Sequence, residues 1–165
     1  NFDSFYSVGR VFSADEVLSL AVESRRLLPE VVLSVTVPHT LPLDSQAQLA
    51  LDLVDNGVDL IQTEGGTSAH PISPGTLGLI EKASPTLAGT FAISAALKES
   101  YNNVPVICAS GLSEVTIPMA LSVGATGVGI GSAVNKLNTE LEMIATVKCL
   151  RQACNSFKLL GTMMQ

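Results

Sequence analysis

The chain alternates short β-branched segments with segments of helical periodicity, and this alternation limits the possible folds more than any other feature. Strand-like runs lie at 31–37, 58–63, 104–110 and 127–134, and helical patterns lie before, between and after them. No two strand-like runs are joined by a two-residue hairpin turn. The order therefore predicts parallel strands connected by crossover helices.

Chain length and element order favour one parallel architecture over another. A closed (βα)8 barrel takes about 250 residues, whereas this chain has 165 and starts with a helix that lacks a preceding strand. We expect one α/β domain over 1–165, the C-terminal half of a (βα)8 TIM barrel with its parallel strands five to eight. The chain opens on Asn1, so we expect an excised piece whose targeting segment is missing. An open doubly wound sheet is the alternative, but it leaves glycine turns at two consecutive strand ends unexplained.

Composition excludes several classes of partner. The chain is 47% hydrophobic with a net charge of −6, and its nine Lys and Arg residues are scattered, so neither nucleic acid nor an anionic membrane surface is an expected partner. No apolar run approaches the roughly 20 residues of a membrane span. The three cysteines form no C-x-x-C motif, which favours a reducing compartment. Cys108, inside an apolar run, is expected to be a small buried hydrophobe.

Helix-start signals predict several element boundaries. A capping box is expected at each of two helix starts. A further helix is expected to open at Ser45 with Gln48. A long loop after Glu64, with one helical turn at 77–82, is expected to end where a new helix starts at Ser84-Pro85. The two capping boxes are Ser13 with Glu16 and Thr139 with Glu142.

Two glycine turns suggest an anion site. The run GVGIGSAV at 127–134 places glycine at every second position, and ASGLS at 109–113 stands at the end of the preceding strand. In TIM barrels the loops after strands seven and eight often hold a phosphate, and glycines let backbone N–H groups approach an anion. The alternative is that the glycines only permit close packing. The expected phosphate-binding residues are Ser110, Gly111, Leu112, Gly131, Ser132 and Ala133, and Lys136 is expected to assist.

Polar residues at the other strand ends provide candidate catalytic groups. Glu64, beside Gly65-Gly66, could be a general acid or base if partial burial raised its pKa; a structural carboxylate is the alternative. His39 could protonate a substrate oxygen or join Glu64 around a metal, but two ligands are too few and no metal site is expected. His70 is expected to be solvated. Residues of one parity that could face the barrel interior are Ser34, Thr36, Gln62 and Glu64.

Several long motifs resemble one family. They are NFDSFY, LSVTVPHTLPLD, IQTEGGTS, PGTLGLIEKASPTLA, ICASGLS and GVGIGSAVNKLN. Together they resemble the hypothetical chloroplast reading frame twenty-three family, with a family-like core over 1–138 and a C-terminal helix and tail over 139–165. The resemblance implies an aldolase-type TIM barrel in the plastid stroma whose N-terminal half supplies the strand before Asn1. It implies no particular reaction.

Two functions follow as hypotheses. The first is an enzyme acting on a small phosphorylated metabolite, as a lyase, isomerase or synthase, with Glu64 and His39 as catalytic residues. The second is a non-catalytic phosphate-ligand-binding or regulatory barrel. The same turns would also suit the phosphate of FMN. Four βα units leave two open sheet edges, so a missing N-terminal barrel half or a second copy is the expected partner.

Overall fold

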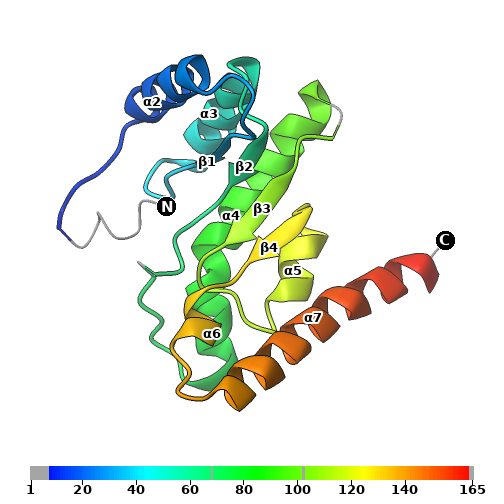
Figure 1. The fold of residues 1–165 in the computed structure, drawn as a ribbon. Helices are drawn as coiled ribbons and strands as arrows, with labels where there is room; N and C mark the ends of the chain where they lie inside the picture. The colour runs from blue at the N-terminus through cyan, green and yellow to red at the C-terminus, as the bar shows by residue number, and fades with distance from the viewer. Residues whose placement is uncertain (1–7, 68, 102, 164–165) are drawn as a thin grey trace.

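The structure, a computed structural model, describes residues 8–67, 69–101 and 103–163 (Figure 1). Four short strands alternate with helices along the chain, as the sequence pattern predicts. In chain order the elements are α2 (Ala14–Leu27), β1 (Ser34–Thr36), α3 (Leu43–Asp55), β2 (Leu60–Gln62), α4 (Gly75–Ser100), β3 (Val106–Ala109), α5 (Ile117–Ser122), β4 (Gly127–Gly129), α6 (Ser132–Asn135) and α7 (Glu140–Met163). No helix in the described ranges is long and apolar enough to cross a membrane.

The strands form one parallel sheet in the order β1-β2-β3-β4. Register pairs Thr36 with Gln62, Gln62 with Ile107, and Ile107 with Gly127. Since paired residues of parallel strands project from the same face, these four residues share one side of the sheet. The predicted α/β class and parallel pairing are therefore confirmed.

The two faces of the sheet differ in what covers them. Ile61 and Val106, on one face, belong to a buried cluster with residues of α2, α3 and α4. On the opposite face Gln62, Ile107 and Gly127 are only partly buried. Helices thus pack on one side of the sheet. The other side carries polar and small residues toward the carboxyl ends of the strands.

The core is built from two apolar clusters. The larger one joins α2, α3 and α4 to the sheet through fully buried residues such as Leu53, Ile61 and Ile93. The smaller one packs Cys108 and Leu112 against α4 and α5. Cys108 has 0% of its surface exposed, so it is the small buried hydrophobe that the sequence predicts.

Helix α4 corrects one predicted boundary. A single helix of 26 residues runs from Gly75 to Ser100 with Pro85 inside it, so the helix start predicted at Ser84-Pro85 is wrong. Proline lacks the N–H that would bond the carbonyl four residues back, at Glu81. The Ser84 hydroxyl donates to that same carbonyl at 2.8 Å. The local cost of proline is thereby reduced, and the helix continues.

The other helix starts follow local chemistry. Thr139 and Glu142 form the predicted reciprocal capping box. Ser13 accepts from the Glu16 N–H at 3.2 Å, although the Glu16 carboxylate bonds Arg10 instead. Helix α3 begins at Leu43, two residues before the predicted Ser45, and its first hydrogen bond runs from the Gln46 N–H to the carbonyl of the N-cap residue Pro42 at 2.9 Å.

Candidate functional site

A polar pocket lies at the carboxyl ends of β2, β3 and β4. Its volume is about 340 Å³, a size suited to a small metabolite. The structure brings together all six residues expected at the phosphate, from two turns about 20 residues apart in sequence. The lining residues are Gln62, Thr67, Ala109, Ser110, Gly111, Leu112, Gly129, Ile130, Gly131, Ser132 and Ala133.

The turn after β3 has an unusual backbone. Ser110 and Gly111 have φ values of 75° and 74°, in the left-handed region that a side chain normally disfavours. The Ser110 hydroxyl accepts from the Thr67 N–H at 3.0 Å and lies 3.3 Å from the Thr67 hydroxyl oxygen. The loop after β2 therefore helps to hold Ser110 in a conformation that costs free energy.

The same loop makes a close backbone contact with this turn. A Cβ built on Gly66 would lie 2.4 Å from Gly111 Cα and Gly111 N. A Cβ on the preceding Gly65, whose φ is +122°, would lie 2.8 Å from Pro85 Cβ and 3.0 Å from His39 Cγ. Sequence reasoning missed Thr67 as a pocket residue, although the Gly65-Gly66 pair was the signal for this contact.

The alternating glycines at 127, 129 and 131 have two different explanations. A Cβ at Gly127 would meet Ile107 Cδ1 at 2.9 Å, and a Cβ at Gly129 would meet Ala109 Cβ at 3.0 Å. These two glycines accommodate side chains of β3. A Cβ at Gly131 would meet nothing within 4 Å, so this glycine borders open space in the pocket.

The short helix behind the second turn contributes less to anion binding than the sequence suggests. Helix α6 has only four residues, too few for a substantial macrodipole. Ser132 and Ala133 are its first two residues, and helix-starting N–H groups have no carbonyl acceptor within the helix. Any anion binding at this turn must therefore depend on individual N–H groups.

His39 and Glu64 form a pair beside the pocket loop. His39 Nδ1 lies 3.3 Å from Glu64 Oε1, and 15% and 0% of the two side chains are exposed. The Glu64 side chain is completely buried, not partly buried as expected from the sequence. The imidazole is slightly exposed and the carboxylate is not, and neither residue is among those that line the polar pocket. In the described ranges no group of three or more His, Cys, Asp and Glu residues could hold a metal.

The remaining predicted polar residues separate into different environments. Gln62 lines the pocket, Thr36 is buried, and Ser34 is exposed. Thr63, of the opposite parity, bonds the Thr86 and Thr90 hydroxyls of α4 inside the core. His70 and Lys136 are exposed, and neither of them lines the pocket.

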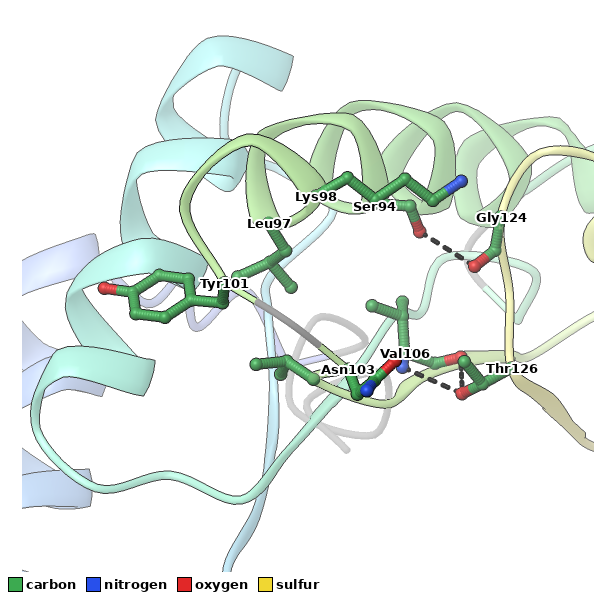
Figure 2. Close-up of a pocket in the computed structure, with 9 residues that line it drawn as sticks. Ser94, Leu97, Lys98, Tyr101, Asn103, Val106, Gly124 and Thr126 are labelled. Carbon is green, nitrogen blue, oxygen red and sulfur yellow. Dashed lines mark hydrogen bonds between the residues drawn. The ribbon is translucent and has the colours of Figure 1, made fainter.

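A second pocket lies at the opposite, amino ends of β3 and β4 (Figure 2). Its volume is about 140 Å³, and Leu97 and Val106 form apolar walls. The Ser94 hydroxyl donates to the Gly124 carbonyl, and Thr126 bonds the backbone of Val106. The chemistry of parallel α/β folds takes place at the other end of the strands, so this pocket is not the candidate site.

The lining of the larger pocket does not fit FMN well. Its eleven residues include no aromatic side chain and no charged one. A phosphate could meet the backbone of the two turns, but among the described lining residues none can stack on an isoalloxazine ring.

Comparisons with known proteins identify relatives. The chain is 36% identical over 156 residues to the uncharacterized protein ycf23 of Porphyra purpurea, covering 94% of this chain and 57% of that protein. It is 47% identical over 146 residues to ycf23 of Cyanophora paradoxa, covering 87% and 57%. The chain thus spans about half the length of the curated relatives it matches. The crystal structure of the YdjI aldolase from Escherichia coli K12 aligns with 17% identity and a TM-score of 0.49, covering 91% of this chain and 56% of that one.

A family match covers nearly the whole chain. It runs over residues 1–159, past Asn138 and through most of α7. The chain belongs to the family described as Protein of unknown function (DUF561), together with the algal ycf23 proteins.

Proposed function

We propose that the chain is the C-terminal half of a (βα)8 barrel, with strands five to eight, and that the barrel binds a small phosphorylated metabolite at the carboxyl ends of these strands. One observation carries the proposal. The two turns at 110–112 and 131–133, which are expected from the sequence to hold one phosphate, line one pocket. The parallel sheet with helices packed on one face is the arrangement that a barrel wall requires.

Backbone geometry supports phosphate as the bound group. Successive backbone N–H groups in a turn can form a concavity that attracts anions, and the turn with Ser110 and Gly111, both at positive φ, lines the pocket. Gly131 leaves open space at the second turn. The ligand's phosphate would lie between the turns, with the hydroxyls of Thr67 and Ser110 at one side.

The pair of His39 and Glu64 supplies the chemistry in the enzymatic form of the proposal. His39 would transfer a proton to or from the substrate as a lyase, isomerase or synthase requires. The buried Glu64 would act as a positioning residue, because a carboxylate bonded to one ring nitrogen orients the imidazole and fixes the position of its proton.

One observation favours a second candidate, a non-catalytic or regulatory phosphate-binding barrel. The Glu64 side chain is 0% exposed, so it cannot itself touch a substrate. A turnover assay separates the two candidates once a ligand is known, because the binding barrel would retain affinity without product formation.

Inorganic phosphate tests the binding site directly. A ligand that binds only the folded state raises the melting temperature by mass action, so phosphate should stabilise the full-length protein. Gly131→Val should abolish this increment, because its side chain would project into the open space. Wild-type protein with no phosphate-dependent shift would refute the site, as would a Gly131→Val variant that keeps the full shift.

The proposal extends to partners and location. Several large apolar residues are exposed outside the core. They include Leu20 and Val32, near the edge strand β1, and Leu141 and Ile144 on α7. These residues would be covered by the N-terminal barrel half or by a second copy. We place the barrel in the plastid stroma, since the relatives are algal ycf23 proteins. Sedimentation of residues 1–165 alone as a monomer with a sharp, cooperative unfolding transition would contradict the need for a partner.

A further inference from the structure

We infer that Lys82 of α4 supplies the positive charge of the phosphate pocket. The inference rests on the proposed function and adds a residue to it. Sequence reasoning expected this role for Lys136, which follows the second turn. In the structure neither lysine is among the pocket-lining residues, but Lys136 is exposed, whereas Lys82 packs against the first turn.

Contacts at Gly111 place Lys82 against the turn. A Cβ built on Gly111 would lie 3.2 Å from Lys82 Cγ and 2.9 Å from the Lys82 carbonyl oxygen. The lysine stem therefore packs on the backbone that is proposed to bind the phosphate. Three further bonds separate Cγ from the amine nitrogen, and the chain between them is flexible. The amine can thus approach the pocket rim while its stem stays half-buried.

The charge of Lys82 is not used elsewhere in the described part of the chain. No ion pair or hydrogen bond of its amine occurs there. The adjacent Glu81 carboxylate is occupied by the Ser73 hydroxyl and by the N–H groups of Ile72 and Ser73. The chain has a net charge of −6, so acidic partners for a lysine are plentiful. Lys82 nevertheless has no acidic partner among the described residues, and its charge is therefore available to a ligand.

The pocket itself needs such a charge. None of its eleven lining side chains is charged, and a phosphate monoester carries close to two negative charges at neutral pH. Backbone N–H groups fix the position of the anion, and a nearby ammonium adds attraction as a point charge. Lys82 would therefore favour a phosphate monoester over a neutral ligand of the same shape.

Calorimetric titration of the full-length protein with inorganic phosphate tests this inference. Lys82→Gln should weaken binding about tenfold, while Lys136→Gln, the matched control, should bind within about twofold of wild type. Lys82→Arg should restore most of the affinity, because it keeps the charge. Urea unfolding of each variant without phosphate separates a folding defect from a binding defect.

The outcomes separate the two proposals. If wild type binds phosphate and Lys82→Gln binds equally well, the role of Lys82 is refuted while the pocket stands. An affinity loss in Lys136→Gln as large as that in Lys82→Gln would show only a general effect of net charge, which also overturns the inference. If wild type does not bind phosphate, the proposed function fails and the inference fails with it.

Discussion

Gly66, beside the first pocket turn, is a position where one added methyl group should have a large structural effect. In Gly66→Ala the new Cβ would lie 2.4 Å from three backbone atoms of Ser110 and Gly111, so either the loop or the turn must move by about 1 Å to restore normal contact. Overpacking of this kind costs about 1–3 kcal/mol. For a chain of this length that corresponds to a melting temperature lower by about 2–12 °C. Thermal and urea unfolding of the full-length protein measure it.

Gly131→Ala is the matched control for this prediction. It makes the same chemical change at the other turn, where a Cβ meets nothing within 4 Å and the backbone φ of −114° suits any residue. Alanine there should leave stability unchanged or raise it by about 0.4–1 kcal/mol, because it restricts the unfolded chain. Equal stability of Gly66→Ala and Gly131→Ala would refute the argument that the two backbones touch.

Three further substitutions test other parts of the structure. Glu64→Gln keeps the buried volume and one oxygen that can face His39, so it should unfold near the wild-type temperature yet lose ligand affinity or turnover; a stability loss of about 2 kcal/mol would instead indicate a structural role. The pKa of Glu81 is held below its ordinary value of 4.5 by the Ser73 hydroxyl and N–H groups. Its contribution to stability is therefore present above that value and is lost as pH falls through the lowered pKa. Thermal unfolding from about pH 7 to about pH 3 should show the difference between wild type and Glu81→Gln shrinking in acid, and a constant difference would contradict this. Ser84→Ala should cost about 0.5–1.5 kcal/mol with Pro85 present and less in a Pro85→Ala background, where the new N–H can bond the same carbonyl; additive effects in this double-mutant cycle would contradict the role of the hydroxyl.

The order of elements could be predicted from sequence because the spacing of apolar residues in each element reflects which of its faces is buried. The run from Val104 to Ser110 alternates residues between a helix-covered face and an open face, and its centre became β3. Exact boundaries depend on single interactions that a pattern does not show. The hydroxyl of Ser84, which donates to the Glu81 carbonyl that Pro85 cannot reach with an N–H, is one such interaction.

The candidate site was predictable in part for a similar reason. Glycine turns at adjacent strand ends must meet when the strands are neighbours, so the grouping of Gly111 and Gly131 follows from topology. The contacts of Thr67 and Lys82 join segments far apart in sequence, and no local pattern marks them. The complete burial of Glu64 likewise depends on tertiary packing that no local pattern shows.

The strand order has a consequence for how the chain can be made. Since the sheet runs β1-β2-β3-β4 in the order of synthesis, no later strand inserts between two earlier ones. Each new βα unit joins an edge that already exists, and the ribosome releases the units in that same order. The sheet can therefore grow during translation by the addition of one βα unit at a time to its free edge.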